Sequence, residues 1–278
     1  MNQPRPRFAW VLGWAIPPEW FRPMAEAALP AAQHVLVEPS PATWDELQAA
    51  GPFDWVVGYS LGSLILLQDS QRASALGRVA LLAPIWAFPT EAAAGGRIPR
   101  GNLRALARAY RSSPVAALES FYQTAGLSDR IEGSGSGSLQ GFRGVKAQRR
   151  RVDEVERDLR GALGPTAFRP EQPLSPTRPS SRPPNGEVAL HPGHETLEAF
   201  RYPIPQGKEA AAHLWGLEQL EKVQLSPSLP PSWHAWTGQN DALLDATRQQ
   251  TLVSALTIVP GATHHPAELI AAFSAAST

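Results

Sequence analysis

The 278-residue sequence contains no cysteine, no long apolar run and no excess of either charge. The absence of cysteine excludes disulfide bonds, thiol catalysis and zinc sites built from cysteine ligands. It is compatible with a reducing compartment, and we expect a cytoplasmic protein. The 25 basic residues balance 25 acidic residues, so the global charge predicts binding neither to nucleic acid nor to membrane surfaces. No stretch approaches the roughly 20 consecutive apolar residues of a transmembrane helix.

The N-terminal segment mimics a secretion signal. Arg5 and Arg7 precede an apolar run over 8–16, as the charged and apolar regions do in signal peptides. Within that run stands the pair Gly13-Trp14, which is better explained as a turn inside a folded domain. We therefore interpret residues 8–12 as the first strand of that domain.

The first third of the chain alternates strand and helix patterns. Strands are predicted over 8–12, 34–38, 55–57 and 78–84, and helices over 18–29, over 43–50 and directly after residue 62. Short apolar runs that alternate with helices indicate a mostly parallel sheet covered by helices on both faces. The sequence therefore predicts an α/β fold, whose active site would lie at the carboxyl ends of the strands.

Between residues 86 and 225 the pattern becomes mainly helical. Helices are predicted over 102–110, from Ser113 as cap to about Gly126, over the charged stretch 145–163, and over 209–223. A Gly/Ser linker at 133–138 and the proline-rich stretch 165–205 predict loop or disorder. We expect a core formed by 1–85 and 226–278, with a helical cap inserted over 86–225 and partly disordered over 130–205.

Residues 58–62 read Gly-Tyr-Ser-Leu-Gly, between an apolar run and a helical pattern. This is the pattern of a nucleophile elbow, in which a serine stands at the tip of a tight strand-to-helix turn. We expect side chains at Gly58 or Gly62 to collide with neighbouring elements there. Ser60 is the candidate nucleophile, although a serine that merely caps the next helix would occupy the same place.

An acid and a base follow on two strand-like stretches near the C-terminus. Asp241 follows the stretch 233–236, and His264 follows the stretch 255–259. The order Ser, Asp, His is the one that nucleophile-elbow enzymes use. Asp245 and His265 are the rival residues, but we place Asp245 inside a helix starting at Ala242 and His265 in the lead-in to a helix over 267–275. Asp241 could instead be a solvated turn residue or the N-cap of that first helix.

The chain resembles the short α/β-hydrolases of the pimeloyl-[acyl-carrier-protein] methyl ester esterase family of biotin synthesis. The matching segments are Leu12-Gly13-Trp14 with Glu19-Trp20, the elbow at 58–62, the stretches 216–220 and 223–225, and the positions 238–241 and His264. The resemblance implies an α/β-hydrolase fold and an oxyanion hole made by the backbone N–H groups of Trp14 and Leu61. It also implies a substrate pocket, to which we assign Trp14, Tyr59 and Trp86. A tryptophan that simply fills the core is an equally good interpretation of the Trp14 indole.

The leading hypothesis is a serine carboxyl-ester hydrolase that works through an acyl-Ser60 intermediate. Its substrate would be a small ester or, by the resemblance, a pimeloyl methyl ester on an acyl carrier protein. An acyltransferase, a C–C bond hydrolase and a non-catalytic binding protein on the same fold are the alternatives. A basic cluster at 143–151 is followed at once by acidic residues, so we interpret it as a solvated helix. We expect neither a metal nor an organic cofactor.

Overall fold

The computed structural model describes residues 4–127 and 205–277. The sequence-based predictions for the linker at 133–138, the charged helix at 145–163 and nearly all of the proline-rich stretch lie outside these residues. In the described ranges, no helix is both long and apolar enough to cross a membrane.

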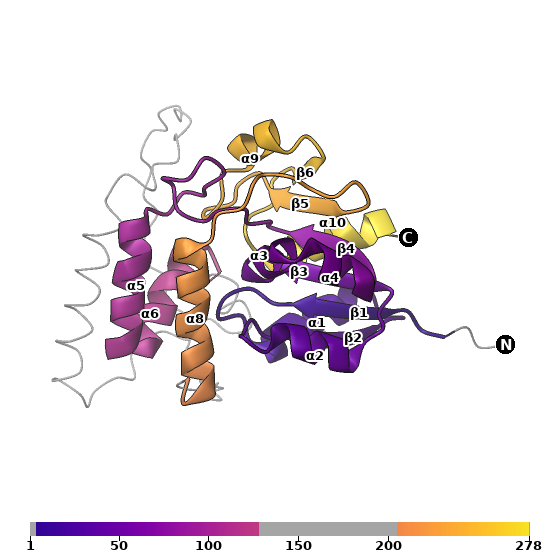
Figure 1. The fold of residues 1–278 in the computed structure, drawn as a ribbon, viewed down its shortest axis with the longest axis horizontal. Helices are drawn as coiled ribbons and strands as arrows, with labels where there is room; N and C mark the ends of the chain where they lie inside the picture. The colour runs from indigo at the N-terminus through magenta and orange to yellow at the C-terminus, as the bar shows by residue number, and fades with distance from the viewer. Residues whose placement is uncertain (1–3, 128–204, 278) are drawn as a thin grey trace, which may run out of the picture.

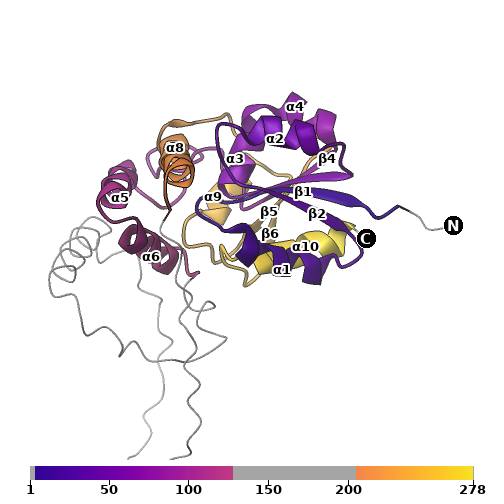
Figure 2. The same ribbon diagram turned by 90° about the horizontal axis from the view of Figure 1, so that it is seen from below.

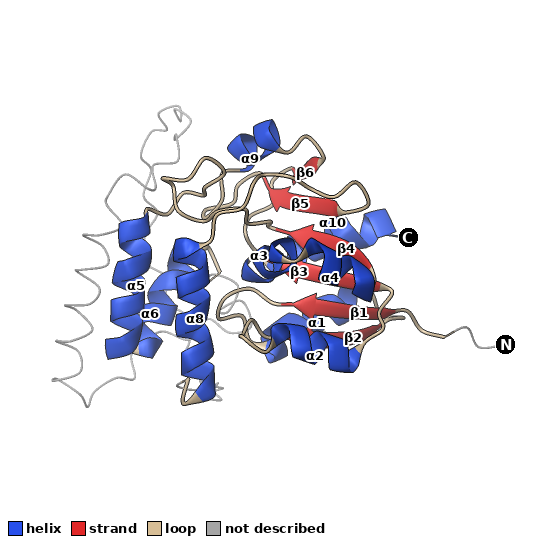
Figure 3. Ribbon diagram, in the orientation of Figure 1, coloured by secondary structure: helices blue, strands red, loops and turns tan. Residues whose placement is uncertain are grey.

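Six strands form one sheet in which every neighbouring pair is parallel (Figures 1 and 3). The strand order is β2-β1-β3-β4-β5-β6. The strands are β1 (Arg7–Val11), β2 (Gln33–Val37), β3 (Trp55–Tyr59), β4 (Arg78–Leu82), β5 (His234–Gly238) and β6 (Leu256–Val259). The predicted α/β class with a parallel sheet is confirmed.

Helices cover both faces of the sheet. Figure 2 shows α1 (Pro18–Ala28) and α10 (Pro266–Ser277) on one face, with α2 (Thr43–Ala50), α3 (Leu61–Gln68) and α4 (Ser70–Leu76) on the other. This double cover explains why the central strands are apolar throughout, because side chains on both sides of them are buried. All five residues of β3 are buried, whereas the edge strand β2 is only partly buried.

Three further helices lie together beyond the carboxyl ends of the strands (Figure 1). They are α5 (Arg100–Ser112), α6 (Pro114–Thr124) and α8 (Lys208–Lys222), and we call them the cap helices. Ser113 occupies the N-cap position of α6, as predicted, but its side chain makes no capping hydrogen bond. The division of the chain into a core and a separately inserted cap stays a prediction, because most of the proposed insertion lies outside the described residues.

The helix α9 (Ala246–Leu252), the last one in the described ranges to be placed, corrects one prediction. A helix starting at Ala242 is wrong, because the chain first makes a non-helical turn around the Asp241 carboxylate. Asp241 Oδ1 accepts hydrogen bonds from the backbone N–H groups of Leu243 and Leu244, at 2.8 and 2.9 Å. Asp245 is then the N-cap of α9 and accepts from the Arg248 N–H at 3.0 Å, so it does not lie inside the helix.

Candidate active site

Ser60 stands alone between the end of β3 and the start of α3. Its backbone angles are φ 52° and ψ −114°, in the left-handed region that residues with a side chain rarely adopt. Such a conformation costs about 1–3 kcal/mol and persists only where the surrounding structure enforces it. The Ser60 side chain makes no capping hydrogen bond to α3, which removes the interpretation of Ser60 as an ordinary helix cap.

The two glycines of the elbow are required by close backbone approaches. A Cβ on Gly58 would lie 2.8 Å from the backbone N and Cα of Ser63. A Cβ on Gly62 would lie 2.0 Å from the carbonyl oxygen of Val11 in the neighbouring strand β1. The collisions expected at both positions are therefore present, and the tight turn between β3 and α3 depends on both glycines.

Ser63 ties the elbow to the next strand, a role that the sequence analysis missed. Its buried hydroxyl donates to the Ser60 carbonyl at 2.5 Å and accepts from the Ile85 N–H at 2.9 Å. These two bonds connect the strained residue to the chain that follows β4. The sequence offers only a serine in the first turn of a predicted helix as a signal for this role. It does not reveal that the Ile85 N–H is the partner.

The structure brings the three side chains of the predicted Ser-Asp-His set into one hydrogen-bond chain. The Nε2 atom of His264 lies 3.1 Å from the Ser60 hydroxyl, and its Nδ1 atom lies 2.7 Å from Asp241 Oδ2. All three are buried, with 7, 1 and 2% of Ser60, Asp241 and His264 exposed. Asp241 is therefore not a solvated turn residue, and both of its oxygens have partners.

The two adjacent histidines have different surroundings. The backbone carbonyl of His264 accepts a 2.6 Å hydrogen bond from the Tyr59 hydroxyl. Burial raises the pKa of Tyr59 well above its ordinary value, and the nearby Asp241 carboxylate raises it further, so this hydroxyl stays a donor. His265 instead packs edge-on against Trp20, with ring centroids 5.4 Å apart. Only His264 thus lies in the chain that joins Asp241 to Ser60.

Of the two predicted oxyanion donors, Leu61 follows Ser60 directly in the chain. Leu61 is the first residue of α3, where a backbone N–H has no partner inside the helix, and Trp14 lies in the turn after β1. Neither N–H donates a hydrogen bond to any other residue in the described part of the chain. The same turn contains Ala15 at φ 54°, whose carbonyl accepts a hydrogen bond from the Tyr122 hydroxyl of α6. Backbone N–H groups without a partner can stabilise a developing negative charge on oxygen when they point at it, and the role of Leu61 and Trp14 as such donors stays a prediction.

The Trp14 indole is enclosed by the cap helices. Its Nε1–H donates to the His213 carbonyl of α8 at 2.8 Å, and its ring meets Phe121 of α6 edge-on, with centroids 4.6 Å apart. Tyr110 of α5 packs against it and also bonds the His213 ring nitrogen, at 2.7 Å. Burial lowers the pKa of His213 to about 4, so this ring is neutral at physiological pH.

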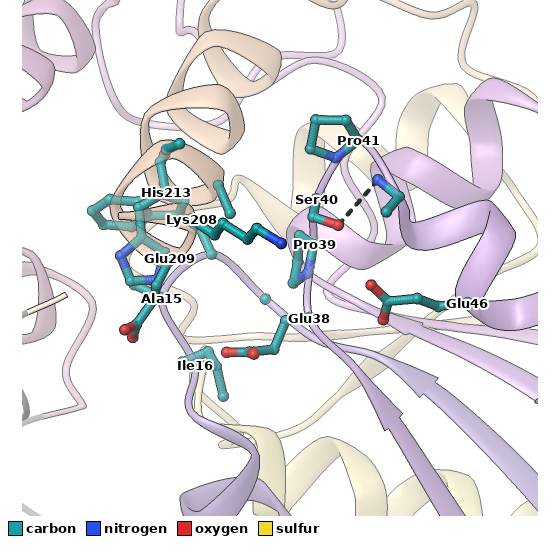
Figure 4. Close-up of a pocket in the computed structure, with 15 residues that line it drawn as sticks. Ala15, Ile16, Glu38, Pro39, Ser40, Pro41, Glu46, Lys208, Glu209 and His213 are labelled. Carbon is teal, nitrogen blue, oxygen red and sulfur yellow. Dashed lines mark hydrogen bonds between the residues drawn. The ribbon is translucent and has the colours of Figure 1, made fainter. Parts of the chain in front are cut away.

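A cavity of about 630 Å³ opens beside this turn (Figure 4). Its walls come from the turn after β1, the chain after β2 and the start of α8. Trp14 belongs to the lining, whereas Tyr59 and Trp86 do not. Trp86 is fully buried, and its indole N–H donates to the Ser228 carbonyl at 3.0 Å. A role for Tyr59 and Trp86 in a substrate pocket therefore stays a prediction.

The charged residues around this cavity are mostly acidic. Among the described residues, Glu38, Glu46 and Glu209 line it together with one cation, Lys208 (Figure 4). Partial burial raises the pKa of Glu38, and the carboxylates of Glu209, Glu19 and Glu46 raise it further. In the described residues, no group of three histidine, aspartate or glutamate side chains is arranged to hold a metal ion.

The parallel sheet, the strained serine between β3 and α3, and the order Ser60, Asp241, His264 together decide the fold. The chain has the α/β-hydrolase fold. No protein-family model matches it, and no curated protein matches it. Solved structures similar to it include an N-formylmaleamic acid deformylase from Pseudomonas putida, at 12% identity, TM-score 0.48, and coverage of 98% of this chain and 91% of that one.

Two other solved structures are also similar to this chain. An α/β-hydrolase from Sphaerobacter thermophilus is 16% identical, with TM-score 0.47 and coverage of 98% of this chain and 93% of that one. An epoxide hydrolase from metagenomes of hot environments is 12% identical, with TM-score 0.44 and coverage of 98% and 89%. The fold is assigned from the sheet and the elbow rather than from these TM-scores, which all lie below 0.5.

For the ester hydrolysis predicted from the sequence, replacing Asp241 by asparagine is expected to lower kcat by about 10⁴-fold. An amide in this position favours the wrong imidazole tautomer of His264, while the geometry stays intact. The matched control is Asp245→Asn, because asparagine caps a helix as well as aspartate does. We expect this control to keep kcat within about twofold in a p-nitrophenyl ester assay at pH 7. If Asp241→Asn keeps its activity and Asp245→Asn loses it, the role of the acid that orients His264 belongs to Asp245.

Proposed function

We propose that the protein is a serine hydrolase that cleaves carboxylic esters through an acyl-Ser60 intermediate. The observation that carries this proposal is the buried hydrogen-bond chain from Asp241 through His264 to Ser60, which ends at a strained elbow. A serine hydroxyl is a weak nucleophile by itself, and it becomes reactive when a neighbouring base accepts its proton. The geometry provides that base at 3.1 Å.

In the first half of the proposed reaction, the Ser60 hydroxyl oxygen attacks the ester carbonyl while its proton passes to His264 Nε2. The negative charge that develops on the carbonyl oxygen is stabilised by the N–H groups of Trp14 and Leu61. Donors of this kind contribute about 3–4 kcal/mol each. The C–O bond to the leaving group then breaks, and His264 returns the proton to the departing alcohol.

In the second half, water attacks the acyl-Ser60 carbonyl and gives its proton to His264. Collapse of this intermediate releases the acid and restores the Ser60 hydroxyl with the same proton. Asp241 accepts the His264 Nδ1–H throughout, which fixes the ring orientation and stabilises the transient imidazolium. Transfer of the acyl group to another alcohol or amine would share the first half of this sequence and differ only in the acceptor.

A pimeloyl methyl ester on an acyl carrier protein is the specific substrate that the sequence resemblance supports. The acidic lining around Glu38, Glu46 and Glu209 argues for testing the free methyl ester beside the carrier-bound form, because like charges repel an acidic carrier. A higher kcat/KM for the carrier-bound ester would support carrier recognition. Equal values would assign the activity to the acyl group alone.

The test of the general proposal is hydrolysis of p-nitrophenyl esters from acetate to decanoate, together with labelling by a fluorophosphonate probe. We expect turnover, a chain-length optimum, and a single phosphonyl adduct on Ser60 by peptide mass spectrometry. Products formed with added alcohols or amines would indicate acyl transfer instead. Folded protein that neither turns over any ester nor labels at Ser60 would contradict the proposal and favour a binding role.

A further inference from the structure

Gly216 stands in the middle of α8, at the point where this cap helix meets the elbow. A Cβ at this position would lie 2.7 Å from Trp14 Cδ1 and 2.9 Å from Leu61 Cδ2. Real Cβ atoms do not approach other atoms this closely, so a side chain here would force something to move. The two residues that it would meet are the two predicted oxyanion donors.

The rest of α8 gives no local reason for a glycine. The helix reads Lys-Glu-Ala-Ala-Ala-His-Leu-Trp before it and Leu-Glu-Gln-Leu-Glu-Lys after it, and most of these residues are strong helix formers. Glycine is among the poorest residues for a helix interior because it loses the most backbone freedom. Its use in the interior of α8 therefore points to the close approach of backbone to neighbouring side chains.

Trp14 cannot make room by turning its ring. The indole N–H is bonded to the His213 carbonyl one turn before Gly216 on the same helix. The ring also packs against Phe121 and Tyr110, from α6 and α5. A methyl group at 216 would therefore displace either α8 or the turn that carries the Trp14 N–H. Leu61 would shift with it, because the same methyl group meets its side chain.

We propose that Gly216 is a positioning residue that lets α8 press on Trp14 and Leu61 and thereby holds their N–H groups at the oxyanion. This inference rests on the proposed function, in which those groups stabilise the tetrahedral intermediate. The three atoms nearest to a Cβ at position 216 belong to Trp14 and Leu61, and none of them belongs to Ser60 or His264. Its effect on the reaction passes through the two donors that α8 supports.

The test is Gly216→Ala, measured on the wild-type's best p-nitrophenyl ester. We expect kcat to fall by about 100-fold, because a displacement of about 1 Å at a reacting centre costs about that factor. KM is expected to change by no more than about twofold, because the ground-state ester makes weaker use of the donors. Inhibition by a trifluoromethyl ketone, which forms the oxyanion on Ser60, should weaken by the same factor as kcat/KM. Inhibition by the corresponding alcohol should not change.

Gly101 gives the matched control, because it lies in the cap helix α5 and a Cβ there would meet nothing within 4 Å. Gly101→Ala makes the same chemical change in the first turn of a helix, and its kinetics should equal those of the wild type. A cooperative thermal transition recorded for both variants shows that they fold. The double variant Gly216→Ala with Leu61→Ala removes the Cδ2 that the added methyl group meets. In that background we expect the Gly216→Ala loss in kcat to shrink to about tenfold.

The outcomes separate the two proposals. An active wild type with an unchanged Gly216→Ala variant overturns the inference and leaves the proposed function standing. A loss that appears in KM and in the alcohol inhibitor also overturns it, because Gly216 would then shape the substrate cavity. The inference is also overturned if Gly216→Ala is unstable and lowers kcat just as much in the Leu61→Ala background. A wild type without turnover or Ser60 labelling removes both proposals together.

Discussion

Replacing Ser60 by alanine is expected to abolish ester turnover, with a loss in kcat of about a million-fold. In comparable enzymes, removing the nucleophile alone lowers kcat about as much as removing all three residues of the triad. The rate that remains comes from substrate binding and oxyanion stabilisation. The fold should survive, because the Ser60 side chain does not cap α3 and alanine meets the same backbone strain. Steady-state p-nitrophenyl ester hydrolysis and thermal melting followed by circular dichroism measure the two effects.

The control for this variant is Ser112→Ala, an exposed serine near the end of α5. It removes the same hydroxyl group from the surface and should leave both kcat and the melting temperature unchanged. Turnover of Ser60→Ala above one thousandth of the wild-type rate would place the nucleophile elsewhere. Loss of the cooperative melting transition would show that Ser60 serves the fold rather than the reaction.

Replacing His264 by alanine should lower kcat almost as far as the serine variant does, because base and nucleophile act as one unit. His265→Ala removes the neighbouring ring, whose Trp20 contact stabilises the fold, and we expect a lower melting temperature with kcat within about fivefold of wild type. The comparison uses the same ester assay at a temperature below both melting transitions. Fluorophosphonate labelling of Ser60 should be lost in His264→Ala and kept in His265→Ala.

Equal losses at the two histidines would contradict the assignment of His264 as the base. A large loss only in His265→Ala would exchange their roles. A double variant that is no slower than His264→Ala alone would support a single base, because residues of one catalytic unit are strongly non-additive. This last comparison also separates catalysis from stability, since stability effects at adjacent positions would accumulate.

The fold was predictable because each signal came from a local pattern. Apolar runs alternating with helical segments predicted a parallel sheet, and both faces of β3 are indeed buried. The elbow was predictable because the tight turn leaves no room for side chains at the two glycines around the serine. A Cβ at Gly58 or Gly62 would collide with backbone atoms. The positions of Asp241 and His264 followed from strand ends, since parallel strands bring their carboxyl ends to one edge.

Other features depend on packing between distant segments, and the sequence carries little sign of them. Asp241 accepts the N–H groups of Leu243 and Leu244 much as an N-cap residue does, yet the regular helix α9 begins only at Ala246. The bond from Tyr59 to the His264 carbonyl joins residues that lie 205 positions apart in the chain. Trp14 is buried among three helices and also belongs to the lining of the cavity, so its role as a wall of the substrate pocket stays a prediction.

The sheet joins β4 to β5 across the whole cap, through pairs such as Leu82 with Trp236. During synthesis, the elbow and its serine leave the ribosome long before the acid and the base do. Closing so long a loop is slow compared with folding of the neighbouring strands. Under the proposed function, a chain that ends before β5 would carry Ser60 without Asp241 and His264. Ser60 would then gain its predicted base only when the last two strands have docked.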